Sequence, residues 1–243
     1  KTWKLYPFET SAKSVNAALY NASAYTLTPR SYGLDKSAQA GIVGQVQAGV
    51  YPYAAPQLAE LQGTQYLFYL DDASERGDAD RTVLCYRKAT ASGWSDPVRV
   101  QDDGTGDYSF ALLEAPDGLY VLWQNTTTSF GNACDSLQTM QKAIGLTAAK
   151  ITASGVQKTW TLNTTRNRMP VLPALALNEG GVTAVWAENT TNALDGSGTN
   201  TIYAQTLDGK RSVYATLDCP SLTLQAGTFD GNFTVAWTQD MDG

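Results

Sequence analysis

One short pattern occurs four times in this chain and constrains its fold more than any other feature. A glycine opens the pattern, alternating apolar residues follow, and an aromatic residue precedes a polar exit. The four copies are GVTAVWAEN (181–189), GLYVLWQN (118–125), GTQYLFYLD (63–71) and GNFTVAWTQD (231–240). Alternation with a period of two is typical of a β-strand. A strand repeated along the chain predicts an array of similar sheets.

The aromatic residues of the four copies, Tyr69, Trp123, Trp186 and Trp237, recur about 50 to 60 positions apart. Four-stranded propeller blades repeat at roughly 40–50 residues plus their loops. A Pro-x-Leu start precedes three of the copies, at residues 56, 173 and 220. Because proline has no N–H, it suits the edge of a sheet, and the innermost strand of a blade is such an edge.

The predicted fold is therefore all-β, a β-propeller of four-stranded antiparallel blades. Three blades are complete and others partial, so the chain is expected to be a piece of a larger ring or a small ring with an incomplete last blade. We favour the first, and expect a larger polypeptide. No segment favours a helix beyond one or two turns at residues 13–20. The expected divisions are 1–50 (an N-terminal strand and a long connector), 51–107, 108–167 and 168–219 (blades), and 220–243 (a partial blade).

Composition excludes several kinds of chemistry. The 243 residues include no histidine, which excludes Ser-His-Asp and Cys-His nucleophile systems and histidine-based zinc sites. Three widely spaced cysteines, at positions 85, 134 and 219, imply neither a disulfide framework nor a four-thiolate zinc site. The formal net charge of −6 argues against nucleic acid as a partner. No apolar run approaches the ~18 residues of a membrane-spanning helix.

The order of these motifs, continued by Gly93-Trp94-Ser95-Asp96-Pro97, resembles the blades of sialidase-like propellers. Such propellers occur in secreted and surface-anchored bacterial proteins that act on glycans, which implies that location here. The Asp-box of that family is degenerate at residues 90–94, where the tryptophan and a glycine remain but the aspartate is missing. No residue of the family's catalytic arginine triad or Tyr–Glu pair is assigned in this chain.

The repeated aromatic residues allow two interpretations. They could form stacking platforms for sugars, but we favour packing between neighbouring sheets, because large rings dominate core burial. The polar residues that follow them begin the loops between the second and third strands, on the face where propellers commonly bind ligands. We predict a ligand site there, although Asn and Asp also start turns by bonding their own backbone. The candidate ligand-binding residues are Asp71, Asp72, Asn125, Thr126, Glu188, Asn189 and Asp240.

Two loops are acidic. Residues 71–80 carry five carboxylates, and residues 102–107 (DDGTGD) carry three. Oxygen ligands near glycines suit Ca²⁺, but neither loop has a known calcium-binding spacing, so we expect solvated turns and no cofactor. A glycoside hydrolase would need two carboxyl groups roughly 5–9.5 Å apart, and the inner strands carry few acids, chiefly Glu60.

Three functions are consistent with the sequence. The leading hypothesis is a non-catalytic module that binds a glycan or a protein ligand, and we expect no enzymatic activity. The alternatives are a glycoside hydrolase of the sialidase-like kind, and a structural spacer or protein–protein platform. An enzyme would require a pair of acids on the loop face together with an arginine or aromatic clamp. A binding module would require exposed aromatic rings beside amides.

Overall fold

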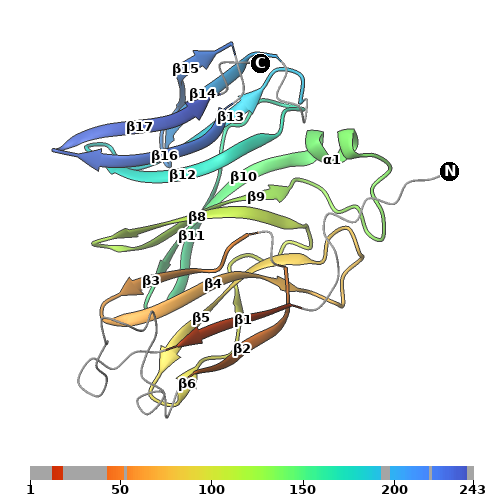
Figure 1. The fold of residues 1–243 in the computed structure, drawn as a ribbon, viewed down its shortest axis with the longest axis vertical. Helices are drawn as coiled ribbons and strands as arrows, with labels where there is room; N and C mark the ends of the chain where they lie inside the picture. The colour runs from red at the N-terminus through yellow and green to blue at the C-terminus, as the bar shows by residue number, and fades with distance from the viewer. Residues whose placement is uncertain (1–12, 19–42, 52–53, 193–197, 219–220, 240–243) are drawn as a thin grey trace, which may run out of the picture.

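The computed structural model describes residues 13–18, 43–51, 54–192, 198–218 and 221–239. These form seventeen strands and one helix, α1 (Leu137–Ala143) (Figure 1). The strands are β1 (Lys13–Ala18), β2 (Val43–Val50), β3 (Gln57–Leu61), β4 (Thr64–Asp72), β5 (Thr82–Thr90), β6 (Gly93–Trp94), β7 (Val98–Arg99), β8 (Asp107–Ala115), β9 (Gly118–Thr126), β10 (Ile144–Thr152), β11 (Gly155–Thr161), β12 (Pro170–Asn178), β13 (Gly181–Asn189), β14 (Asn200–Thr206), β15 (Arg211–Leu217), β16 (Ser221–Phe229) and β17 (Asn232–Gln239).

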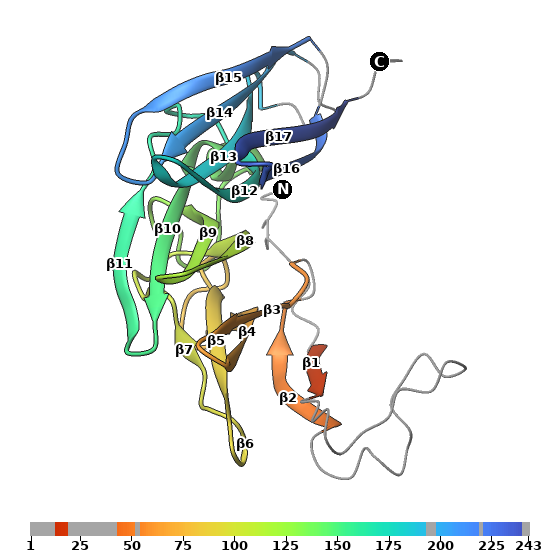
Figure 2. The same cartoon turned by 90° about the vertical axis from the view of Figure 1, so that its left-hand side faces the viewer.

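Three antiparallel sheets form the body of the protein, and we call the four-stranded unit in each of them blades 1, 2 and 3. Blade 1 has the order β3-β4-β5-β7, and β6 also pairs with β5. Blade 2 has the order β8-β9-β10-β11, and blade 3 has the order β12-β13-β14-β15. The hairpin β16-β17 follows blade 3. The hairpin β1-β2 lies at the other end, where β2 pairs with β4 at Val50 and Asp71 and so extends the sheet of blade 1 to seven strands (Figures 1 and 2). The prediction of an all-β propeller of four-stranded blades is confirmed.

Each blade packs its two faces against different neighbours, as the alternation in its second strand predicts. In β9, Trp123 contacts the core shared with blade 1, whereas the adjacent Leu122 contacts the core shared with blade 3. In β13, Trp186 faces blade 2 and Val185 faces the β16-β17 hairpin. Because successive side chains of a strand point to opposite faces, one apolar run supplies both interfaces.

The repeated aromatic residues are packing residues, as we favoured. Tyr69, Trp123 and Trp186 are at most 1% exposed, and Trp237 is half-buried. Each lies on the face of its sheet that is turned toward the preceding part of the chain. The rings of Tyr69, Trp123 and Trp186 are therefore not exposed as platforms for a sugar.

Side chains join the innermost strands of neighbouring blades. The Gln57 amide donates to the carbonyl of Phe110 at 3.1 Å, and the main-chain N–H of Glu60 donates to the Glu114 carboxylate at 2.7 Å. Farther along, Thr228 donates to the carbonyl of Leu177. The free edges of the inner strands therefore satisfy part of their hydrogen bonding across the blade boundary.

Two local expectations are wrong. Residues 13–18, expected as one or two helical turns, form strand β1, which pairs with β2 in antiparallel register. Helix α1 was not expected; Ser136 caps it by accepting a hydrogen bond from the N–H of Thr139 at 3.1 Å. No helix in the described residues is long and apolar enough to cross a membrane.

Candidate functional site

Loops from blades 1 and 2 meet at one end of the sheets. We call this surface the loop face; it comprises residues 73–81 and 127–143, between second and third strands, and residues 100–106, which lead into β8. The N–H of Ala79 donates to the carbonyl of Gly131 at 2.9 Å, and Thr126 donates to the carbonyl of Gly106 at 2.9 Å. The two kinds of loop therefore share a face.

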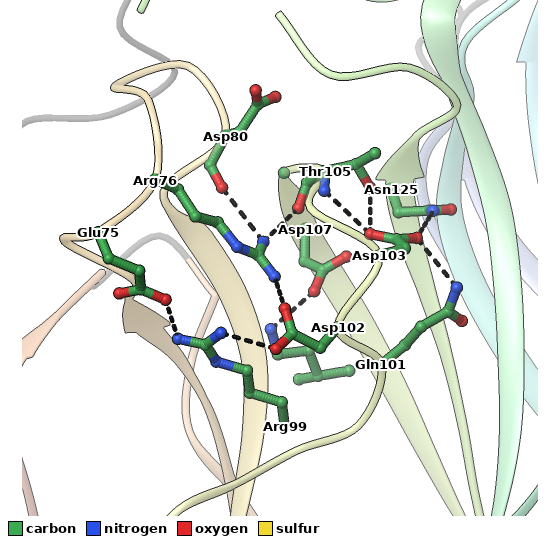
Figure 3. A network of polar contacts seen from close by, with 12 residues as sticks. Glu75, Arg76, Asp80, Arg99, Gln101, Asp102, Asp103, Thr105, Asp107 and Asn125 are labelled. Carbon is green, nitrogen blue, oxygen red and sulfur yellow. Dashed lines mark hydrogen bonds and ion pairs between the residues drawn. The ribbon is translucent and has the colours of Figure 1, made fainter. Parts of the chain in front are cut away.

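Two arginines bracket Asp102 on the loop face (Figure 3). Arg76 pairs with one oxygen of the Asp102 carboxylate, and Arg99 pairs with the other at 2.8 Å. Arg99 also pairs with Glu75. The hydrogen bonds from Arg76 and Arg99 hold the pKa of Asp102 below its ordinary value, so this carboxylate is ionised in neutral solution.

Asp103 is exposed, and its two oxygens accept hydrogen bonds from different sides (Figure 3). Oδ1 accepts from the N–H of Thr105 at 3.0 Å and from the Thr105 hydroxyl at 2.7 Å. Oδ2 accepts from the Gln101 amide at 2.9 Å, and the Asn125 amide lies 3.5 Å away. The loop thus presents a carboxylate next to two amides, which is a polar arrangement suited to sugar hydroxyls.

Asp107 lies beneath this loop, at the start of β8, and is 3% exposed. Its Oδ1 accepts from the Trp123 indole, and its Oδ2 accepts from the N–H of Leu84 in blade 1, both at 2.8 Å. Burial raises the pKa of Asp107 to about 7, and the nearby charge of Asp103 adds to the rise, against the opposing effects of the two donors and of Arg76. Asp107 is therefore a carboxyl that holds a proton close to neutral pH.

Glu188 occupies a similar place in blade 3 and is fully buried. Its Oε1 accepts from the Trp186 indole at 2.8 Å and from the N–H of Thr165 at 2.9 Å, and Arg211 lies 3.7 Å away. Within the described residues, Oε2 is buried without a hydrogen-bond partner.

The residues predicted to bind a ligand do not form one exposed group. Asn125, Thr126, Glu188 and Asn189 are all buried. Asp71 and Asp72 are half-buried and hold structural partners: Asp71 accepts from Gln47, and Asp72 pairs with Arg81 at 2.5 Å. Asp240 lies outside the described residues. Asn125 is the member that reaches the Asp103 carboxylate, and the ligand-binding role of the set stays a prediction.

Asp103, Asp107 and Arg76 were not among the predicted ligand-binding residues. The acidic loop 102–107 was considered as a calcium site and as a source of paired carboxylates, and its three acids lead directly into an inner strand. In the described residues, no group of three or more Cys, Asp or Glu is arranged to hold a metal ion. The calcium site stays a prediction. Cys85 and Cys134 are buried, and Cys219 lies outside the described residues.

The comparisons with known proteins concern the fold. No family model matches the sequence, and no curated protein matches it. Among solved structures, the chain resembles an endo-arabinase from Bacteroides thetaiotaomicron (12% identity, TM-score 0.50, 80% of this chain and 76% of that one). It also resembles an α-L-arabinanase from Penicillium chrysogenum solved with arabinobiose (12% identity, TM-score 0.50, 100% of this chain and 78% of that one).

These comparisons overturn two expectations. The non-catalytic interpretation, and with it the expectation of no enzymatic activity, is wrong, because the similar structures are carbohydrate-cleaving enzymes. The sialidase-like resemblance is supported only at the level of a propeller of the kind found in glycan-acting proteins. At 12% identity the likeness establishes the fold, and the reaction is a matter for proposal.

Proposed function

We propose that the chain is a glycoside hydrolase that acts on arabinose-containing polysaccharides and binds them at the loop face. The observation that carries the proposal is one loop that holds two carboxyl groups of contrasting exposure, Asp103 at the surface and Asp107 beneath it. The fold likeness to two arabinan-cleaving enzymes supports the choice of substrate class.

Hydrolysis of a glycosidic bond commonly uses two carboxyl groups, of which one gives a proton to the leaving oxygen. A proton donor works best when its pKa lies near the working pH. Burial, which raises the pKa of Asp107 to about 7, gives it that property. We assign the proton donor to Asp107, which is 3% exposed and therefore acts only when substrate binding opens the loop above it. We assign the second carboxylate, which acts on water or on the sugar carbon, to Asp103.

The amides beside Asp103 fit the binding of sugar hydroxyl groups. Asn125 and Gln101 carry both donor and acceptor atoms, and both lie at the same carboxylate. We infer that they orient the sugar over Asp103. Polysaccharides of this kind are met outside cells, so we infer a secreted or surface-displayed protein.

The test is release of reducing sugar from debranched arabinan, arabinoxylan and xylan, with a sialoside in the same panel for the sialidase alternative. Wild type should cleave an arabinose-containing substrate, and D103N should lower kcat/KM by roughly 10³-fold. D96N is the matched control, since Asp96 is also exposed but lies in the β6-β7 segment of blade 1. Folded wild type that releases sugar from none of the arabinose-containing polymers would refute the proposal.

A further inference from the structure

Arg76 reaches from one loop of the loop face into another. Its guanidinium donates to the carbonyl of Thr105 at 2.7 Å and to the carbonyl of Asp80 at 3.3 Å, and it pairs with the Asp102 carboxylate. The side chain is only 9% exposed. A buried cation that donates to several acceptors fixes their positions relative to one another, because losing it removes the one group that all of them share.

Two of these acceptors lie on either side of Asp103 in the chain. Arg76 holds the side chain of Asp102 before it and the main chain of Thr105 after it. Thr105 in turn donates twice to Asp103 Oδ1. The position of the exposed carboxylate therefore depends on the guanidinium, although Arg76 and Asp103 share no hydrogen bond.

We infer that Arg76 is a positioning residue that holds Asp103 over Asp107 without touching the substrate. The inference rests on the proposed function for its catalytic consequence, but the arrangement itself can be tested without activity. Arginine suits this task because its planar fork bonds several acceptors in fixed directions, whereas a lysine ammonium acts as a point charge.

Arg99 provides a matched control. It pairs with the other oxygen of Asp102 and with Glu75, and its side chain is 33% exposed. It has no hydrogen bond to Thr105 or Asp80 among the described contacts. Replacing Arg99 therefore removes one partner of Asp102, while Arg76 keeps its hydrogen bond to the carbonyl of Thr105.

The charges around Asp107 predict a spectroscopic signature. Asp103 in the same loop and Arg76 in the facing loop act on its pKa in opposite directions. Burial and, in turn, the charge of Asp107 raise the pKa of Tyr108, the next residue in β8, as does the charge of Asp80. Burial and the charge of Asp107 also raise the pKa of Cys85 in β5. Removing the Arg76 charge should raise the pKa of Asp107 further, and R76K should largely restore it.

The experiment titrates Asp107 by carboxyl ¹³C NMR and measures the pH profile of kcat/KM on arabinan, in the full chain. R76M should raise the pKa of Asp107 and lower kcat/KM about 100-fold with little change in KM. R76K should restore the titration but leave kcat/KM about 10-fold low. R99M should leave the titration unchanged.

An Asp107 titration that R76M and R99M shift equally, or that neither shifts, would overturn the positioning role. So would an R76M enzyme whose activity per folded molecule, with the folded fraction taken from circular dichroism, equals that of wild type. If wild type itself hydrolyses none of the arabinose-containing polymers, the proposed function fails, while the NMR comparison still decides whether Arg76 controls the surroundings of Asp107.

Discussion

The indole N–H of Trp123 donates a 2.8 Å hydrogen bond to Asp107 inside the interface between blades 1 and 2. In blade 3, Trp186 makes the same contact with Glu188 at the same distance. The two acids nevertheless lie on different strands. Asp107 is on β8, opposite Asn125, whereas Glu188 is on β13, opposite Pro170. Both blades thus contain a tryptophan–carboxylate contact. The carboxylate comes from the first strand in blade 2 and from the second strand in blade 3.

Replacing Trp123 by phenylalanine should remove this donor and leave a small void. We expect a loss of about 3 kcal/mol of unfolding free energy, since a buried acceptor loses a partner and the core loses volume. The pKa of Asp107 should rise, because the indole bond favours the ionised form. Urea unfolding measures the loss, and W160F is the control: Trp160 bonds the exposed Asp208 and should cost less than about 1 kcal/mol.

The raised pKa of Asp107 predicts a pH dependence of stability. Between the ordinary aspartate pKa of 3.8 and about 7, the folded protein holds a proton that the unfolded chain has released. Linkage then requires that this group lower the stability as pH rises through that window, and contribute no further change above it. Stability of wild type and D107N is measured by urea unfolding from pH 4 to 8.

The difference in unfolding free energy between wild type and D107N should change mainly between the ordinary aspartate pKa and about pH 7. Relative to D107N, wild type should lose stability between pH 4 and 7. D102N is a control without a slope in this range, because Arg76 and Arg99 lower the pKa of Asp102, so its contribution to stability changes only below its ordinary pKa of 3.8. Parallel pH curves for wild type and D107N would contradict the assignment.

Close contact of two loops should make Gly77 intolerant of a side chain. A Cβ at Gly77 would lie 2.2 Å from the main-chain carbon of Gly131, and rigid backbone cannot yield as a flexible side chain does. We expect G77A to cost about 3 kcal/mol or more in urea unfolding. G227A is the control, since a Cβ there meets nothing within 4 Å. Equal stability of the two variants would show that the loops separate freely.

Asp80 should be a strong anchor of the same loops. Its carboxylate is 1% exposed and accepts from the Ser129 hydroxyl at 2.6 Å, from Phe130 N–H and from Gly131 N–H at 2.7 Å. D80N turns one acceptor into a donor that faces these groups, so we expect a loss of about 2–4 kcal/mol. D78N, whose carboxylate is more exposed and pairs with Arg81 at 3.4 Å, should change stability by less than about 0.5 kcal/mol.

Sequence patterns predicted the sheets well, because the residues of a strand themselves determine which of its faces are apolar and can be buried. The glycine, the alternating residues and the aromatic of residues 181–189 specify one strand with two apolar faces, and β13 has those bounds. The prediction failed where the secondary structure of a segment depends on the strand with which it pairs. Residues 13–18 contain helix-forming alanines and lysine, yet pairing with β2 makes them a strand.

The candidate site was only partly predictable. The polar residues after each tryptophan mark the right end of the sheets, and Asn125 does lie beside Asp103. However, the alternation of the strand continues through these residues, so Asn125 and Glu188 point into the blade interfaces. The link from Asp107 to Leu84 spans 23 positions between blades, and the sequence carries no local signal for it.

Hydrolysis of debranched arabinan by wild type, D103N and D96N tests the enzymatic proposal most directly. The measured quantity is reducing sugar released per folded protein across pH 4 to 8. We predict release by wild type that declines as Asp107 ionises near pH 7, loss of roughly 10³-fold in D103N, and wild-type activity in D96N. Equal release by D103N and D96N, or none by any of the three folded proteins, would contradict the assignment.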